Sequence, residues 1–527
     1  MSNSSPTGLP GASQGSSGAS SAPHPSPPEL LRRGSLAEHH RPWPRAVVDP
    51  SIWQMAGETL AAGGYSLLAL WGEPDCVHLS FWDAGSGAAA VMTLPCPEGR
   101  FPSIGRLHPP ALRLERTIHD LFGLAAEESP DARPWLDHGV WETRFPLGKT
   151  SPSSGPTPYP FLPTEGEELH QVPVGPVHAG IIEPGHFRFT AAGETVVRLE
   201  ERLGYVHRGV EGLLRGEDLE QAAALAARIS GDTTAAYSSA FAQAVEAALD
   251  VEAPSLAHWL RALCVETERV ANHLGDIGAI CNDAAFARMH AFCSVLREKI
   301  LRAADLCFGH RLMMDQIIPG GMRTVPPGEA LRKLRELSEE ITASLPGILQ
   351  VYETTPSLQD RVVGTGVLSR ALASQYASGG VIGRASGRLF DARCHLAYPP
   401  YSSLRFSVPV REEGDVDARI SIRIREVEQS LDLIRQIIDG LPEGPASKPL
   451  PQERVAPGEG VALVEGFRGD LFAWVRLDER ACVERCHFRD PSWFQWPLLE
   501  AVVYGNIIAD FPLCNKSFNC SYSGHDL

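Results

Sequence analysis

The sequence of 527 residues lacks any apolar run near the ~20 residues that a helix needs to span a bilayer. It also lacks excess positive charge: 64 acidic residues outnumber 47 basic ones, giving a net charge of −17. A nucleic-acid surface needs a basic face, so this class of partner is excluded. The first 45 residues lack an apolar core, so they are not a signal peptide. Any association with a membrane therefore has to come through partner proteins.

Paired cysteines are missing as well. Most of the eleven cysteines stand singly inside apolar stretches, where we expect buried free thiols. Cys482 and Cys486 would share one face of a strand, but ~13 Å apart, too far for one metal ion or one disulfide. Cys514 and Cys520 lie near the C-terminus. Because nothing has zinc-ribbon spacing, we expect no metal ligands in this chain.

The distribution of apolar and polar residues along the sequence predicts the α+β class, with four segments. Residues 1–45 are rich in Ser, Gly and Pro and are expected to form a disordered tail. Residues 46–149 are expected to form a small α/β domain, and residues 150–168 a linker. Residues 169–527 should form a mainly α-helical domain with small β-sheets.

Hydrophobic periodicity places the main elements. Apolar steps of four and three predict a helix over 420–441, ended by Gly440 and Pro442. Other predicted helices cover 112–124, 213–229, 233–249, 255–281, 288–314 and 328–349. Strands are predicted at 65–71, 77–82, 461–467, 471–477 and 482–488, the last three as a pair of hairpins.

Two motifs in the first domain resemble the small accessory subunit of complex I. They are Phe101-Pro-Ser-Ile-Gly105, followed by Arg113-Leu-Glu-Arg-Thr-Ile-His-Asp-Leu-Phe-Gly123, and Arg133-Pro-Trp-Leu-Asp-His-Gly139. The resemblance implies that Glu115 and Asp120 dock this domain on its neighbours. The alternative is that both carboxylates lie on a solvated helix face.

From about residue 171 the chain resembles the large subunit of membrane-bound NiFe hydrogenases, and equally the large subunit that forms the quinone site of complex I. Seven blocks match in order: Val174-Gly-Pro-Val-His178 with Ile182-Glu-Pro184, Leu203-Gly-Tyr-Val-His-Arg-Gly-Val-Glu211, Glu266-Thr-Glu-Arg-Val-Ala-Asn-His-Leu274, Pro319-Gly-Gly321, Arg384-Ala-Ser-Gly387, Val408-Pro-Val-Arg-Glu-Glu-Gly-Asp415 and Gly505-Asn-Ile507. The fusion of both units in one chain resembles the energy-converting hydrogenases.

The nickel-ligand blocks of that family are altered here. The family's first cysteine pair falls on Ser230 and Thr233, and its second pair on Ser521 and Gly524. Cys520 lies one position out of register. Soft thiolates select such metals, so the resemblance is to the nickel-free, hydrogenase-related branch.

The quinone ligands of complex I are also missing. The family's histidine falls on Ile182 and its tyrosine on Gly231, and neither side chain forms hydrogen bonds. His186 replaces the histidine if the loop is shifted, and Tyr237 is a poorer substitute for the tyrosine.

Polar residues are left to line the former metal cavity. Glu183 matches the hydrogenase position that passes protons, so we expect a proton relay there. The alternative is a structural carboxylate paired with an arginine. The other residues expected in the cavity are His178, Ser230, Asp232, Thr233, Lys516, Asn519, Ser521 and His525.

The resemblance implies a subunit of a membrane-associated oxidoreductase complex that couples NADH–quinone-type electron transfer to ion translocation. The chain would lie on the cytoplasmic side of the cell membrane, held there by partners. Its partners would be an iron–sulfur small subunit and antiporter-like membrane subunits. We expect no cofactor bound by this chain itself, except a quinone-like acceptor or another small molecule in the cavity. The rival hypothesis is a structural scaffold with a vestigial cavity.

Overall fold

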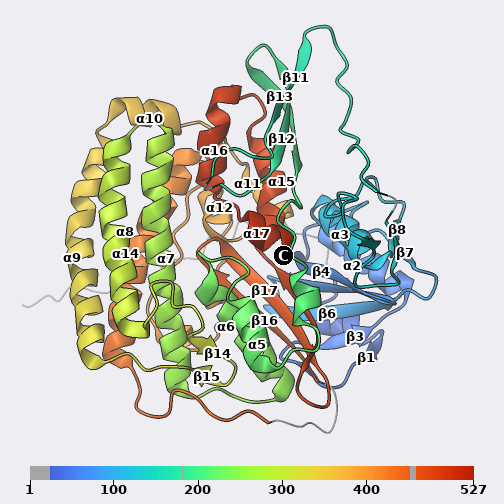
Figure 1. The fold of residues 1–527 in the computed structure, drawn as a ribbon, viewed down its shortest axis with the longest axis horizontal. Helices are drawn as coiled ribbons and strands as arrows, with labels where there is room; N and C mark the ends of the chain where they lie inside the picture. Colours follow the sequence, from blue (N-terminus) through green and yellow to red (C-terminus); the bar gives the residue numbers. More distant parts are fainter. Residues whose placement is uncertain (1–23, 154, 181, 452–457) are drawn as a thin grey trace, which may run out of the picture.

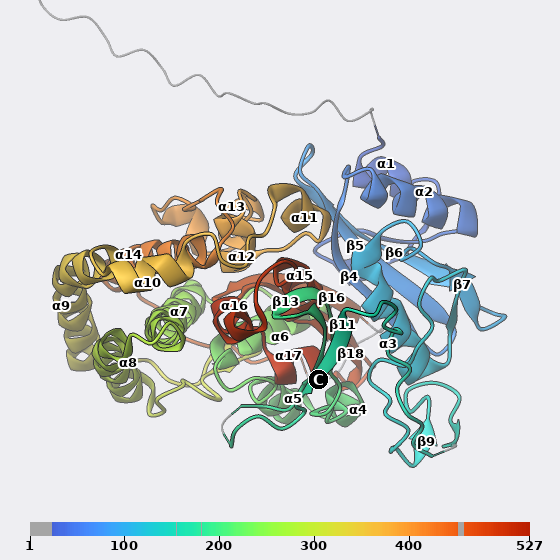
Figure 2. The same ribbon diagram turned by 90° about the horizontal axis from the view of Figure 1, so that it is seen from above.

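The structure is a computed structural model that describes residues 24–153, 155–180, 182–451 and 458–527. An N-terminal unit built on one sheet, blue in Figures 1 and 2, lies beside a larger part that contains the rest of the chain. Long helices form the outer layer of the larger part, on the side away from the N-terminal unit. Separate helices and mostly antiparallel sheets make this an α+β fold, as predicted.

The N-terminal unit has a five-stranded sheet in the order β1-β3-β6-β5-β4. Its elements are α1 (Pro27–Leu31), β1 (Ser35–Leu36), β3 (Arg45–Val47), α2 (Pro50–Ala61), β4 (Ser66–Glu73), β5 (Cys76–Asp83), β6 (Ala88–Pro95) and α3 (Leu112–Phe122). The predicted strands at 65–71 and 77–82 are β4 and β5. The predicted helix at 112–124 is α3, which ends because Gly123 adopts a left-handed φ of 75°.

The prediction of a disordered tail is wrong for residues 24–45. Leu30 and Leu31 on α1 are buried in the core, and β3 pairs in parallel with β6. β2 (His40–Arg41) pairs in parallel with β16 (Gly458–Gly466) of the larger part. These strands are only two or three residues long, too short for periodicity to reveal. Residues 1–23 lie outside the described residues.

Glu115 and Asp120 are buried inside the N-terminal unit and do not face solvent. Glu115 is buried and accepts hydrogen bonds from the backbone N–H groups of Ile104 and Gly105, at 2.6 and 2.9 Å. Asp120 accepts from three successive N–H groups that begin at Trp135. Both carboxylates therefore hold loops of their own unit, so the interpretation as a solvated helix face is wrong, and the docking role stays a prediction.

Four long helices form the outer layer: α7 (Ser255–Asp283), α8 (Ala287–Phe308), α9 (Gly328–Glu353) and α14 (Val416–Gly440). The predicted apolar stripe of α14 is buried from Ile420 to Ile434, and its last members, Ile438 and Leu441, pack against the same core while only partly buried. The predicted helix at 213–229 is instead two helices, α4 (Val210–Leu214) and α5 (Leu219–Ala226). Gly216, at a φ of 85°, separates them, and the Asp218 carboxylate caps α5.

The central sheet has the order β18-β17-β16-β2, with β17 (Gly469–Leu477) and β18 (Val483–Arg489) as the predicted hairpins. Helix α6 (Thr234–Leu249) covers β16 and β17. It lies close because its inner face is alanine-rich and Gly460 has no side chain. A Cβ at Gly460 would lie 1.9 Å from the carbonyl oxygen of Ala244. At the other end of the strand, a Cβ at Gly466 would lie 3.3 Å from Cβ of Ala236, so the N-terminus of α6 packs against the turn that joins β16 to β17.

A three-stranded antiparallel sheet projects beside the C-terminal helices (Figure 1). It consists of β11 (Leu169–Val174), β12 (His186–Ala192) and β13 (Thr195–Arg202), and the C-terminal helices are α15 (Ser492–Val502), α16 (Phe511–Phe518) and α17 (Tyr522–Asp526). The remaining helices are α10 (Pro356–Val362), α11 (Arg370–Gln375), α12 (Gly380–Ala385) and α13 (Ala392–His395). The remaining strands are the short pairs β7 (Arg100–Pro102) with β8 (Ala125–Glu127), β9 (Thr143–Arg144) with β10 (Ser151–Pro152), and β14 (Ile317–Ile318) with β15 (Gly321–Met322).

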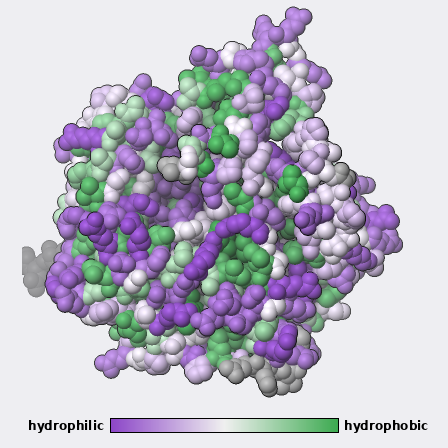
Figure 3. Space-filling view, in the orientation of Figure 1, coloured by the Kyte–Doolittle hydropathy of each residue, from purple (hydrophilic) through white to green (hydrophobic). Residues whose placement is uncertain are grey.

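Hydrophilic and hydrophobic residues are mixed on the face shown in Figure 3, with hydrophobic residues gathered near the centre of the view. Of the described helices, none combines the length and the hydropathy needed to cross a membrane. All eleven cysteines are free thiols, and most of them are buried, as the sequence predicted.

Candidate functional site: a polar cluster between α6 and the C-terminal tail

Two segments almost 300 residues apart meet at the N-terminus of α6. The Ser230 and Ser521 hydroxyl oxygens lie 3.2 Å apart, and both residues are buried. Ser230 and Thr233 each donate a hydrogen bond to Oδ1 of Asp232, at 2.8 and 2.9 Å. The two blocks aligned with the hydrogenase ligand motifs therefore do converge in space.

Arg468, in the turn between β16 and β17, joins these segments. Its guanidinium donates to both carboxylate oxygens of Asp232, at 2.9 and 2.6 Å, and to the Thr233 hydroxyl at 2.8 Å. Its Nε donates to the carbonyl oxygen of Asn519, at 2.6 Å. Burial alone would raise the pKa of Asp232, but Arg468 and the two hydroxyls hold that pKa well below its usual range. We call Ser230, Asp232, Thr233, Arg468 and Ser521 the polar cluster.

Asp490 occupies the space beside Gly524. A Cβ at Gly524 would lie 2.4 Å from Oδ2 of Asp490 and 2.9 Å from the Ser521 hydroxyl. The Tyr237 hydroxyl holds this carboxylate in place by donating to the same oxygen at 2.7 Å. A larger side chain at position 524 therefore cannot enter without displacing Asp490.

Glu183 lies at the edge of the polar cluster rather than inside it. The residue is exposed, and its Oε2 accepts a hydrogen bond from the backbone N–H of Ser523, at 3.1 Å. The arginine partner considered as its structural alternative is not observed among the described residues. His178 lies apart from the cluster, where its Nε2 contacts the carbonyl oxygen of Gly185, at 2.7 Å.

The other predicted tail residues take separate places. Asn519 contributes its carbonyl to Arg468 and donates from its side chain to Asp276, at 2.8 Å. Lys516 is half-buried on α16 and has no hydrogen bond to the cluster. His525 is buried against Trp493, with ring centroids 3.9 Å apart, and its Nδ1 lies 2.8 Å from Asp526. Of the three, only Asn519 contacts the polar cluster.

The cluster leaves little room for a ligand. The hollow lined by Gly231, Asp232 and Glu268 measures about 10 Å³, enough for about one water molecule. Larger cavities lie elsewhere. One of about 590 Å³ is lined by His138, His186, Tyr159 and Tyr205, among others. Another of about 380 Å³ lies between the N-terminal unit and the last residues of the chain, and its lining is mostly apolar.

Sequence reasoning missed a buried carboxyl next to the cluster. Glu268 on α7 accepts hydrogen bonds from the backbone N–H groups of Ala235 and Ala236, at 2.6 and 3.2 Å. Burial raises the pKa of Glu268 to about 8, and the nearby Asp232 charge acts in the same direction. A carboxyl with a pKa near neutrality is suited to proton transfer. The sequence signal that could have identified Glu268 was its position in the 266–274 block, which matches the family.

A larger set of buried charges lies between α7, α12, α13, α14 and β16, and we call it the ionic network. Arg384 donates to Glu426 and to Glu465, both at 2.8 Å, and Arg393 donates to Glu266 at 2.9 Å. The side chains of these five residues are at most 1 % exposed. The ionic network also includes Asp391, Arg269, His273, Tyr401 and Ser430.

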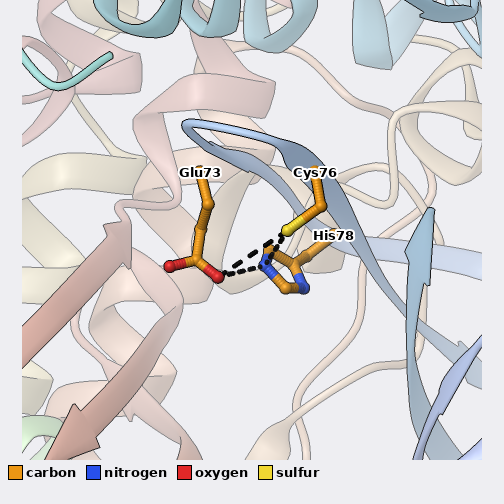
Figure 4. A group of neighbouring side chains, drawn as sticks. All are labelled: Glu73, Cys76 and His78. Atoms are coloured by element: carbon orange, nitrogen blue, oxygen red, sulfur yellow. Dashed lines mark hydrogen bonds and ion pairs between the residues drawn. The ribbon is translucent and has the colours of Figure 1, made fainter. Parts of the chain in front are cut away.

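One further group of ligand-type side chains lies outside the cluster, on the hairpin of β4 and β5. Figure 4 shows Glu73, Cys76 and His78 pointing toward one another. The cysteine spacing alone predicts no metal ligands and does not reveal this group. Glu73 also forms an ion pair with Arg476 of β17, at 2.6 Å, and so links the two parts of the molecule.

Three known families match the chain in sequence. The family described as respiratory-chain NADH dehydrogenase, 49 Kd subunit, matches residues 283–452 and 449–526. Nickel-dependent hydrogenase matches residues 208–275, and respiratory-chain NADH dehydrogenase, 30 Kd subunit, matches residues 76–157. Formate hydrogenlyase subunit 5 of Escherichia coli is 30% identical over 441 residues, which cover 81% of this chain and 77% of that protein.

The chain belongs to the hydrogenase and complex I large-subunit family. The carbon monoxide-induced hydrogenase of Rhodospirillum rubrum is 30% identical over 66% of this chain and 97% of its own length. A chain in the structure of the membrane-bound sulfane sulfur reductase, an archaeal respiratory membrane complex, superposes with a TM-score of 0.65. It is 29% identical, and the match covers 68% of this chain and 99% of that chain.

The nickel–iron centre that the hydrogenases of this family imply does not fit the polar cluster. Ser230, Thr233 and Ser521 offer hydroxyls that stay protonated near neutral pH, and Gly524 offers no side chain. The Arg468 guanidinium adds positive charge between the two segments. Cys520 is buried with its Sγ 4.0 Å from Gln495, so it does not supply a thiolate to the cluster.

The complex I quinone positions are also occupied differently. Ile182 is 47% exposed, and Gly231 is exposed. Tyr237 is fully buried and bonded to Asp490, so it does not face an open cavity. His186 is buried, with its Nδ1 3.3 Å from the carbonyl oxygen of Gly175, and it lines the cavity of about 590 Å³.

Proposed function

We propose that this chain is the large subunit of a membrane-associated oxidoreductase complex, on the cytoplasmic side of the membrane, in which electron transfer by partners drives ion translocation. The polar cluster acts as a closed ionic latch that joins α6, the β16–β17 hairpin and the tail. One observation carries this proposal. The blocks that hold metal ligands in hydrogenases meet here through hydroxyls and an Asp232–Arg468 ion pair.

The latch has the parts needed to respond to a proton. Asp232 is partly exposed, with 38 % of its side chain accessible, while Glu268 lies behind it with a pKa of about 8. Release of the Glu268 proton as the pH rises toward 8 would add a negative charge beside the Asp232–Arg468 pair. Movement of Arg468 would reach Asn519, and through its side chain Asp276 on α7. The rival function, a structural scaffold, predicts that the cluster can be altered without any effect on turnover.

The first experiment purifies the native complex with its partners. We expect an iron–sulfur small subunit, antiporter-like membrane subunits, no nickel and no hydrogen evolution. The family relatives support such partners, since one lies in a respiratory membrane complex. Stoichiometric nickel, or a chain that stays monomeric in gentle detergent extracts, would refute the proposal.

The second experiment distinguishes the proposed latch function of the polar cluster from a purely structural scaffold. Asp232→Asn removes the charge that Arg468 holds but keeps the shape, so we expect assembled complex with reduced turnover. Asp315→Asn is the matched control. Asp315 forms an ion pair at 2.6 Å with Arg228, which lies in the same sequence block as Asp232, and both side chains of that pair are substantially exposed. Equal turnover in the two variants would favour the scaffold.

A quinone-like acceptor is the second candidate function, and we place it in the cavity lined by His186. The observation in its favour is a volume of about 590 Å³ with histidine and tyrosine side chains in its wall. We expect His186→Gln to raise the KM of the complex for a short-chain quinone, with His170→Gln on the neighbouring strand as control. An unchanged KM would exclude this site.

A further inference from the structure

Three side chains with different metal-binding atoms converge on one hairpin, outside the polar cluster. Nε2 of His78 lies 3.0 Å from Oε2 of Glu73, and Sγ of Cys76 lies 3.6 Å from Nε2 and 3.8 Å from Oε2 (Figure 4). Glu73 and His78 are buried, and Cys76 is partly exposed. Thiolate, imidazole and carboxylate are the protein ligands that zinc takes.

The local fold fixes this convergence. Glu73 ends β4 and Cys76 begins β5, and the two residues face each other in the antiparallel register. Cys76 and His78 lie two residues apart on one strand, so both side chains point to the same face of the sheet. The ligands therefore sit on a rigid hairpin rather than on a loop.

The distances suit a tetrahedral ion. Zinc bonds of ~2.3 Å to sulfur and ~2.0–2.2 Å to nitrogen and oxygen give ligand–ligand separations of ~3.3–3.6 Å. The three observed separations lie within a few tenths of an ångström of these values, so small side-chain shifts would complete the geometry. Nδ1 of His78 lies 2.9 Å from the Thr93 hydroxyl, an outer contact that orients the ring and leaves Nε2 for a metal.

Two cations are the main objection: Arg476 already contacts Glu73, at 2.6 and 2.8 Å, and Nε of the buried Arg485 lies 3.7 Å from Oε1 of Glu73. The two carboxylate oxygens together offer about four lone pairs, and Arg476 uses two of them. A zinc ion with one carboxylate and one thiolate is neutral, so it adds only one net positive charge to the present cluster. Glu484 shares Arg476 at 3.0 Å and offsets part of this charge. Arg476 would then act as the outer contact that positions Glu73.

We propose that Glu73, Cys76 and His78 bind one Zn²⁺ ion, with the fourth position open to water. These residues line a cavity of about 770 Å³, through which the ion and its water would enter. The ion replaces the thiol proton of Cys76, which goes to solvent. Because Arg476 lies on β17, the site would also strengthen the junction between the N-terminal unit and the central sheet.

The test uses Co²⁺ as a spectroscopic substitute for zinc on the purified full chain, first stripped with a chelator. We expect one equivalent of Co²⁺ to give the visible bands of a tetrahedral ion and a near-ultraviolet thiolate-to-metal band. Zn²⁺ should displace Co²⁺ and remove both signals. Zinc should also raise the Tm of the chain by a few degrees, because a ligand that binds only the folded state stabilises it.

Two variants locate the site. Cys76→Ala should lose the thiolate band and the rise in Tm, whereas Cys482→Ala, the other partly exposed cysteine of comparable burial, should keep both. His78→Gln gives a second loss if Cys76→Ala folds poorly. The proposal is overturned if no tetrahedral spectrum appears, or if the spectrum persists in Cys76→Ala.

Discussion

The ionic network and the polar cluster are built from similar residues but differ in their surroundings. In the network, Arg384, Glu426 and Glu465 have fully buried side chains and come from packed helices and a strand. In the cluster, the side chain of Asp232 is 38 % exposed, and its partners come from a helix start, a turn and the tail. The fully buried ion pairs of the network are part of the packed core, so they cannot separate without unfolding. In the Asp232–Arg468 pair, water reaches the Asp232 carboxylate while the Arg468 side chain is 6 % exposed, so we expect this pair to open more easily than the network.

Breaking the network should have the largest effect. Glu426→Ala leaves Arg384 and His273 without one of their carboxylate partners, and we expect a loss of about 3–5 kcal/mol in the free energy of unfolding. Chemical denaturation measures it. Glu428→Ala on the same helix is the control, because its exposed pair with Arg425 should contribute at most about 1 kcal/mol. Equal losses would remove the distinction between sealed and accessible charges.

Glu268 should give the next largest effect, as a dependence on pH. Its pKa is raised from 4.5 to about 8 by burial, so the folded state keeps a proton that the unfolded state releases. Stability from this group is complete below pH ~4.5 and is lost as pH rises toward 8, by a few kcal/mol. Denaturation at pH 5 and pH 8 should therefore show a smaller change in Glu268→Gln than in the wild type. Parallel pH curves would mean that Glu268 is ionised in the folded protein.

Asp232→Asn should be milder than either. The carboxylate is partly exposed, so we expect a loss of about 1–2 kcal/mol, less than for the sealed network. The pKa of Asp232 is depressed, so its contribution is present above pH ~4 and fades only as the solution becomes strongly acidic. Thermal melts at neutral pH compare the variant with Glu426→Ala. A larger loss for Asp232→Asn would reverse the comparison.

Glu183→Gln should change stability least, by about 0.5 kcal/mol or less, because the residue is exposed. If Glu183 relays protons to the cluster, turnover of the assembled complex should still fall severalfold. Glu194→Gln, exposed at the turn between β12 and β13, serves as control. Unchanged turnover in Glu183→Gln would leave it only the hydrogen bond that it accepts from Ser523.

The sequence predicted those elements that are long or that carry a clear local pattern of apolar residues. The α14 stripe and the β16–β18 hairpins follow from periodicity, and the ordered blocks correctly brought Ser230 to Ser521. Arg468 was missed because its partner Asp232 is 236 residues away, and local pattern holds no record of that contact. Glu268 was missed because a raised pKa depends on burial, which only the packed structure defines. The sequence did not predict the group of Glu73, Cys76 and His78, because these side chains come together only when β4 and β5 pair as a hairpin.

The β16–β17 hairpin also gives the molecule a mechanical linkage. β16 begins at Gly458 and pairs with β2, which lies between β1 and β3 of the N-terminal unit, and at Gly466 it reaches the turn that carries Arg468. Nine extended residues span roughly 30 Å and resist stretching. The strand therefore connects the N-terminal unit directly to the turn whose Arg468 pairs with Asp232, so the two regions share one rigid element.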